Sequence, residues 1–167
     1  CVPPQPGITP TRAETGYGYL ELGDELSPGV RKVARFVEKP DAASAKAMLA
    51  DGKHLWNSGT FFFRADAVLA EIAAHLPALA DGLSALAREP ARLAEIFGTL
   101  PKVSIDVGVM EKAARIAVLP GDFGWSDVGS FATAWELSSK DAADNAAPPD
   151  AVLVDTRRSL VRAPPGK

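Results

Sequence analysis

The sequence predicts an α/β fold with a layered sheet, followed by a linker and a short segment of one or two further strands. Segments rich in β-branched and aromatic residues alternate with alanine-rich segments of helical periodicity, an order that is typical of α/β sheets. After Lys140 the composition changes to DAADNAAPPD, a polar stretch typical of a linker. AVLVDTRRSLV then predicts one or two new strands, so we place a domain boundary between residues 1–140 and 141–167.

The first third of the chain predicts a hairpin, a helix and a further strand. GYGYLEL and VRKVARFVEKP have the composition of strands, and GDELSPG supplies a turn between them. Asp41 is a natural N-cap for the helix AASAKAMLA, which Gly52 ends. TFFF, residues 60–63, predicts a buried strand.

The remainder of the chain continues the alternation. ADAVLAEIAAHL predicts a helix that ends before Pro77, with an apolar face formed by Val68, Leu69, Ile72 and Leu76. SIDVGVMEKAA predicts a short helix, and RIAVLP predicts a strand that ends at Pro120. FATAWELSS predicts a last helix, directly after the motif GWSDVGS.

Composition and charge exclude several classes of function. The 167 residues carry a net charge of -3 and no cluster of Lys and Arg, which argues against a nucleic-acid partner. No run of about 20 apolar residues is present, so we expect no membrane partner and a soluble, cytoplasmic protein. The single cysteine, Cys1, excludes an internal disulfide and a zinc site built from cysteines.

Glu38 and Lys39 lie where a strand is expected to end at Pro40. Adjacent residues of a regular strand point to opposite faces, so this pair can share one ligand only where the strand stops. A glutamate can accept hydrogen bonds from sugar hydroxyls, and a lysine can place its charge on a phosphate. The alternative is a solvated surface ion pair.

Three further motifs combine polar groups with glycine. Asp127 in GWSDVGS is either a hard oxygen ligand for Mg²⁺ or an N-cap that accepts from Gly129 or Ser130. Asn57 in WNSG offers an amide beside Gly59, or forms an ordinary Asx turn. The two glycines of TGYGY either admit a ligand close to the backbone or accommodate a bulge.

The order of these motifs is more specific than any one of them. The succession PTRAETGYGYLE, FVEKP, LWNSGTFFF, SIDVGVMEKA and GWSDVGSF closely resembles the bacterial mannose-1-phosphate guanylyltransferases, over residues 7–138. The resemblance implies a Rossmann-like nucleotidyltransferase sheet, here partial, followed by a small β-helical domain. It also implies a reaction in which GTP and mannose 1-phosphate form GDP-mannose and pyrophosphate, with Mg²⁺ as cofactor.

The resemblance also implies roles for five residues. Gly18 is expected to line the sugar pocket, Glu38 to hold sugar hydroxyls and Asn57 to contact the sugar ring. Lys39 is expected to contact the sugar phosphate, and Asp127 to bind the metal. No residue is assigned as a covalent nucleophile, because the sugar phosphate itself attacks the α-phosphorus of GTP.

The sequence departs from the family pattern at Ala13, Thr60 and Val107, where proline, methionine and a larger, often aromatic residue are usual. It also contains no counterpart of the family's glycine-rich triphosphate-binding signature or of its first metal-binding aspartate. We therefore expect a fragment that holds the acceptor-sugar half of a site, is inactive alone and exposes sheet edges. The alternatives are a pyrophosphorylase for another sugar 1-phosphate or nucleotide and a noncatalytic sugar-phosphate-binding subunit; a homodimer is left open.

Overall fold

The computed structural model describes residues 4–163, and contacts between Cα atoms divide the chain into two units between Phe123 and Gly124. The first unit contains a sheet and most of the helices, and the second contains one short helix and a long irregular segment. The predicted linker after Lys140 lies within the second unit. The domain boundary between residues 140 and 141 stays a prediction.

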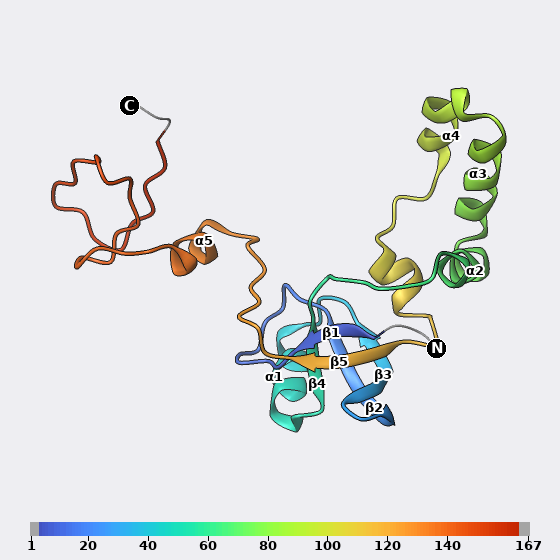
Figure 1. Cartoon of the computed structure of the whole chain (residues 1–167), viewed down its shortest axis with the longest axis horizontal. Helices are drawn as coiled ribbons and strands as arrows, with labels where there is room; N and C mark the ends of the chain where they lie inside the picture. Colours follow the sequence, from blue (N-terminus) through green and yellow to red (C-terminus); the bar gives the residue numbers. More distant parts are fainter. Residues whose placement is uncertain (1–3, 164–167) are drawn as a thin grey trace. The chain divides into compact units, whose positions relative to one another are not determined.

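Five strands of the first unit close into a small barrel (Figure 1). Around the barrel their order is β1-β4-β2-β3-β5, with the bounds Gln5–Ile8, His54–Asn57, Tyr19–Ser27, Val30–Val37 and Ala117–Gly121. Only β1 and β5 pair in parallel, and the other four pairs are antiparallel. The expectation of exposed sheet edges is wrong for this unit, because every strand has a hydrogen-bonded neighbour on both sides.

The barrel interior is the hydrophobic core. Leu20 of β2 pairs with Phe36 of β3 on one side and with Leu55 of β4 on the other, and all three are buried. Residues directly opposite each other on adjacent strands point to the same face of a sheet, so these three side chains share one face. The rest of the cluster comes from the neighbouring strands and the approach to β5: Val33, Ile116 and Val118. This packing fixes the register of the strands, because a slip of one residue would turn the apolar set outward.

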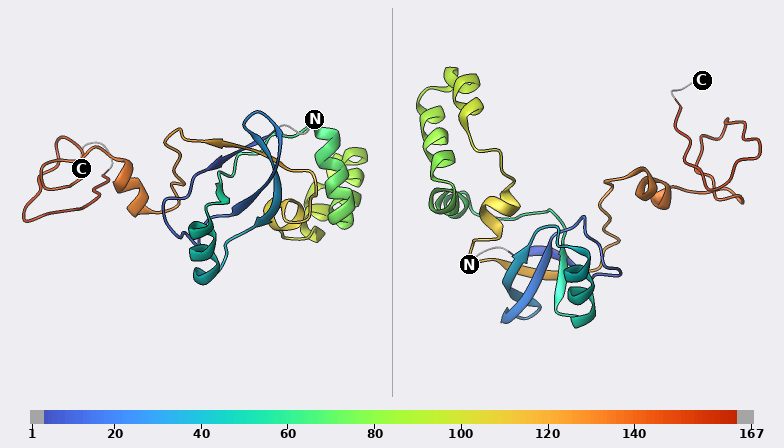
Figure 2. Two further views of the ribbon diagram at one scale, coloured as in Figure 1. Left: turned by 90° about the horizontal axis from the view of Figure 1, so that it is seen from below. Right: turned by 180° about the vertical axis from the view of Figure 1, so that it is seen from behind.

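The predicted hairpin and first helix are confirmed. β2 and β3 are joined at Pro28 and Gly29, and Gly29 has a φ of 78°. Helix α1, Ala42–Asp51, lies beside β4 (Figure 2). Asp41 caps it by accepting a hydrogen bond from the Ser44 backbone N–H at 2.8 Å, which lowers the pKa of Asp41. Gly52 ends the helix in the left-handed conformation, as its position predicts.

The strand predicted at TFFF is wrong. The strand in this region is β4, which ends at Asn57, and residues 60–63 are irregular. β4 is already paired with both β1 and β2, so the closed barrel leaves no edge for a further strand here. Phe62 and Phe63 are consequently 55% and 48% exposed rather than buried.

Helices occupy the segment between β4 and β5. They are α2, α3, the 3-10 turn η1, α4 and the π-helical turn η2, with the bounds Ala65–His75, Pro77–Arg88, Pro90–Arg92, Leu93–Thr99 and Asp106–Met110. The predicted helix after Arg64 is confirmed as α2, and the short helix predicted at SIDVGVMEKAA is present as η2. Within residues 4–163, no helix combines the length and apolar character that a membrane span needs.

The second unit contains helix α5, Phe131–Leu137, which confirms the last predicted helix. The strands predicted at AVLVDTRRSLV are wrong for the described residues, where the only β contact is an isolated bridge between Ala146 and Leu160. Val152 and Val154 are 89% and 75% exposed. A stable strand needs continuous pairing and an apolar layer, and within the described part of the unit this segment has only the single bridge at Leu160.

Candidate functional site

Three of the predicted site residues meet at one end of the barrel. Tyr19 pairs with both Val37 and Trp56, so the next residues outward are Gly18, Glu38 and Asn57. The Asn57 N–H donates to the Gly18 carbonyl at 2.8 Å. Antiparallel pairing thus brings the start of β2 and the ends of β3 and β4 together. Gly18, Glu38 and Asn57 lie close to one another there, although they come from three motifs that are far apart in the sequence.

Gly18 provides the space that this arrangement needs. A Cβ atom at Gly18 would lie 2.7 Å from Glu38 Oε2 and 3.2 Å from the Asn57 Cβ. The first distance is shorter than any ordinary contact, so a side chain at this position would displace the Glu38 carboxylate. The group that lies close to the Gly18 backbone is the Glu38 carboxylate, and the register irregularities of β2 begin only after Glu21. Access of a ligand to Gly18 stays a prediction.

The Asn57 side chain is held at both ends. Its Nδ2 donates to Asp106 Oδ1 at 3.1 Å, and its Oδ1 accepts from the Gly59 N–H at 3.1 Å. The second contact is the Asx turn that WNSG also predicts. A side-chain amide has two donor hydrogens and two acceptor lone pairs, so one of each in Asn57 has no partner among residues 4–163. Asn57 is only 8% exposed, which limits the directions from which a ligand can reach it.

Glu38 and Lys39 follow directly after β3, which ends at Val37 as the proline predicts. Lys39 Nζ lies 3.1 Å from Glu38 Oε1, but the lysine side chain is 64% exposed and the glutamate side chain only 15%. Lys39 also has a φ of 46°. A non-glycine residue in the left-handed region is strained and persists only where its neighbours fix it, a situation common at functional sites.

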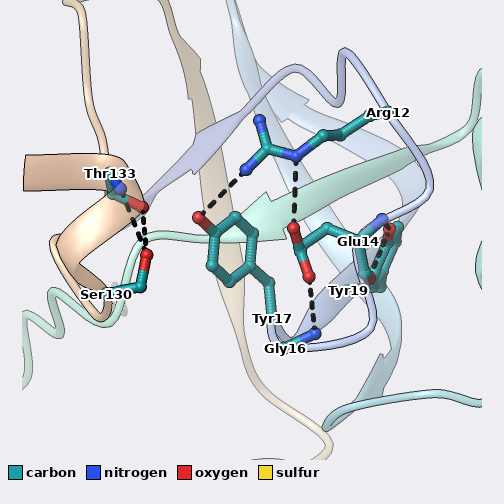
Figure 3. Close-up of polar contacts among 7 residues, drawn as sticks. All are labelled: Arg12, Glu14, Gly16, Tyr17, Tyr19, Ser130 and Thr133. Carbon is teal, nitrogen blue, oxygen red and sulfur yellow. Dashed lines mark hydrogen bonds and ion pairs between the residues drawn. The ribbon is translucent and has the colours of Figure 1, made fainter. Parts of the chain in front are cut away.

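A hydrogen-bonded loop leads into Gly18 (Figure 3). Glu14 Oε2 accepts from Arg12 Nε at 3.1 Å, and Glu14 Oε1 accepts from the Gly16 N–H at 3.0 Å. The Gly16 hydrogen bond, with a smaller contribution from Arg12, holds the pKa of Glu14 below its usual value. The Tyr19 hydroxyl donates to the Glu14 carbonyl at 2.9 Å, which ties the loop to the first residue of β2.

Asp127 is described within the second unit alone. The N-cap of α5 is Ser130, whose hydroxyl accepts from the Thr133 N–H at 3.1 Å (Figure 3). The N-cap alternative for Asp127 is therefore wrong, because a serine nearer to the helix supplies the cap. Asp127 is exposed, and a Cβ at Gly129 would lie 3.2 Å from its Oδ2.

This carboxylate fits a magnesium ion by its chemistry. Asp127 makes no hydrogen bond or ion pair to another of residues 4–163, so both of its oxygens are available. Mg²⁺ is usually held by one or two carboxylates together with phosphate oxygens and water, not by a complete protein cage. The described residues contain no group of three or more His, Cys, Asp or Glu that could enclose a metal.

Two acidic residues of the site were missed by sequence reasoning. Asp106 contacts Asn57, and Glu111 Oε1 accepts a hydrogen bond from the Glu38 N–H at 2.9 Å. Both lie in SIDVGVMEKA, whose pattern predicts a short helix and contributes to the family resemblance but indicates no role for its acids. Two acids five residues apart carry no recognisable local signal, since helical neighbours are three or four residues apart.

The comparison with known families decides the identity of the fold. Residues 5–144 match the family described as nucleotidyl transferase. The chain belongs to the nucleotidyl transferase family. A crystal structure described as mannose-1-phosphate geranyltransferase from Thermus thermophilus has a TM-score of 0.76 and 38% identity with this nucleotidyl transferase, covering 87% of this chain and 43% of that one. The α/β fold class predicted from the sequence is thereby confirmed.

The curated relatives confirm the resemblance stated from the motifs. This nucleotidyl transferase is 40% identical to mannose-1-phosphate guanylyltransferases of Sinorhizobium fredii and Escherichia coli, over 93% and 96% of its own length. It is 41% identical to the xanthan biosynthesis protein XanB of Xanthomonas campestris over 92% of its length. It spans only 32%, 36% and 34% of these three relatives, respectively, or about a third.

Proposed function

We propose that this chain is the acceptor-sugar part of an enzyme that transfers GMP from GTP to mannose 1-phosphate. The products are GDP-mannose and pyrophosphate. The observation that carries the proposal is the meeting of Gly18, Glu38 and Asn57 at one end of the barrel. A carboxylate, an amide and a bare stretch of backbone suit a polyhydroxylated ring, which needs acceptors and donors at short range.

The roles of the residues follow from their contacts. Glu38 has a sheltered carboxylate beside Gly18 and accepts hydrogen bonds from sugar hydroxyls. Asn57 uses its remaining amide hydrogen and lone pair on the ring. Lys39 has an exposed ammonium group, which can leave Glu38 and contact the sugar phosphate.

Catalysis in this proposal consists of positioning and charge neutralisation. The sugar phosphate oxygen attacks the α-phosphorus of GTP in line, and pyrophosphate leaves, so no protein nucleophile is needed. Asp127 would hold Mg²⁺, which when bound neutralises negative charge on the phosphates. A cytoplasmic location, a homodimer and a β domain from residue 141 stay predictions about the whole protein.

The proposal is tested with the full-length protein that contains this sequence. Purified protein is incubated with Mg²⁺, one nucleoside triphosphate and one sugar 1-phosphate, and pyrophosphate release and the sugar nucleotide are measured. We expect the highest kcat/KM with GTP and mannose 1-phosphate. A higher kcat/KM with glucose 1-phosphate or with another nucleotide would contradict the proposed substrates and assign the preferred pair in their place. Binding of a sugar phosphate without turnover would support the noncatalytic alternative.

Replacing Gly18 with alanine should impair use of the sugar substrate specifically. The new methyl group would push the Glu38 carboxylate aside, so we expect KM for mannose 1-phosphate to rise about five- to tenfold, as for the loss of one good hydrogen bond. The KM for GTP should stay within about twofold. Steady-state kinetics with each substrate varied in turn check this.

A matched control is Gly98→Ala. Gly98 lies in α4, and no atom lies within 4 Å of the position that its Cβ would take. This substitution should stabilise the helix slightly and leave both KM values unchanged. Equal effects of the two alanine variants on the sugar KM would contradict the role of Gly18.

A further inference from the structure

We propose that the π-helical turn η2 is a positioning element that holds the sugar site through Asp106 and Glu111. The inference rests on the proposed function and assigns two residues that do not themselves contact the substrate. Asp106 is the first residue of the turn, and Glu111 is its C-cap. Each carboxylate contacts a different one of the substrate-binding residues.

Asp106 fixes the orientation of the Asn57 amide. An asparagine side chain can rotate by half a turn and exchange its oxygen and nitrogen positions. Here the contact with the Asp106 carboxylate requires nitrogen, and the Gly59 N–H requires oxygen. The remaining donor and acceptor of Asn57 are thus presented to the ring in one arrangement only.

Glu111 fixes the backbone that carries Glu38 and Lys39. Its Oε1 accepts from the Glu38 N–H, immediately before the strained Lys39 with its φ of 46°. The next residue, Pro40, is buried. A left-handed residue persists when the chain around it is restrained. Glu111 restrains the peptide between Val37 and Glu38, and the burial of Pro40 restrains the chain after Lys39.

The turn itself is anchored in the first unit. The Glu111 N–H donates to the Asp106 carbonyl at 2.9 Å, which links the two acidic residues through the backbone of a π-helical turn. Val109 is only 3% exposed, and a Cβ at Gly108 would lie 2.9 Å from Leu76 Cδ1. Gly108 thus lies against Leu76, the C-cap of α2, and any side chain at this position would have to displace it. π-helical turns are rare and occur frequently at functional sites.

The functional consequence is separate from binding of the nucleotide. Both contacts act on residues assigned to the acceptor sugar. Their loss should therefore raise KM for the sugar phosphate and leave KM for GTP nearly unchanged. We expect Glu111→Ala and Asp106→Ala each to raise KM for mannose 1-phosphate about tenfold, as for one lost hydrogen bond to a charged group. KM for GTP should change by less than about twofold.

Conservative variants distinguish positioning from a merely structural role. The glutamine of Glu111→Gln can still accept from the Glu38 N–H, and the asparagine of Asp106→Asn can still accept from Asn57. In both conservative variants, KM for the sugar phosphate should stay within about threefold of the wild-type value. Asp81→Ala is the control, because Asp81 is an exposed acid of α3 with no polar contact to another of residues 4–163.

The test combines these kinetics with hydrogen exchange, measured by mass spectrometry on the full-length protein. Glu111→Ala should accelerate exchange in the peptide that contains the Glu38 amide, and Asp81→Ala should not. Unchanged exchange at Glu38, or equal effects on both substrates, would overturn the inference. Exchange does not depend on turnover, so an inactive wild-type protein would count against the proposed function alone. Calorimetric binding of mannose 1-phosphate would then replace KM.

Discussion

Asp127→Asn is expected to lower kcat of the full-length enzyme by about a hundredfold or more, the size usual for losing a group that stabilises transition-state charge. The asparagine keeps the shape of the side chain but removes the negative charge that a Mg²⁺ ligand needs. Asp127 is exposed and is not the N-cap of α5, so the thermal unfolding temperature should stay the same. Turnover as a function of Mg²⁺ concentration, together with calorimetric unfolding, measures both effects.

The control for this variant is Ser130→Ala, three residues away. Ser130 is the N-cap of α5, so its loss should cost about 1 kcal/mol of helix stability and leave the Mg²⁺ dependence of turnover unchanged. If Asp127→Asn lowered the unfolding temperature while turnover held, Asp127 would have a structural role and the metal assignment would fail.

Lys39→Ala is expected to weaken use of mannose 1-phosphate by about 1.5 to 3 kcal/mol in kcat/KM, the value of a charge-assisted contact with phosphate. Alanine has a Cβ like lysine, so the strain of the φ of 46° should change little and stability should be retained. The variant therefore isolates the ammonium group. Steady-state kinetics with varied sugar phosphate give the free-energy difference.

Lys32→Ala provides the comparison for the charge itself. Lys32 is an exposed residue of β3 and pairs with Ala117 of β5 through its backbone. Its side chain makes no ion pair with another of residues 4–163. Its loss should leave kcat/KM within about twofold of the wild-type value. A similar loss in both lysine variants would indicate a general effect of net charge, and Lys39 would then have no place in the site.

Local signals in the sequence were sufficient for several elements. The hairpin of β2 and β3 depends on turn residues between two strand-forming segments, and α1 depends on the cap at Asp41 and the stop at Gly52. Such features depend on contacts between residues close in the sequence, so they form independently of how the rest of the chain packs. The strand predicted at TFFF is wrong because the prediction used only apolar composition. In the barrel, β4 is paired on both sides, with β1 and β2, and no edge is left for TFFF.

The sequence by itself determined the family and named Gly18, Glu38, Lys39, Asn57 and Asp127 through the order of their motifs. Only the tertiary structure decided that Gly18, Glu38 and Asn57 meet, because antiparallel pairing around a closed barrel is a long-range property. It also decided which acids support them. Asp106 and Asn57 are 49 residues apart, and Glu111 and Glu38 are 73 residues apart. Contacts over such separations depend on the packing of whole elements, which no local pattern records.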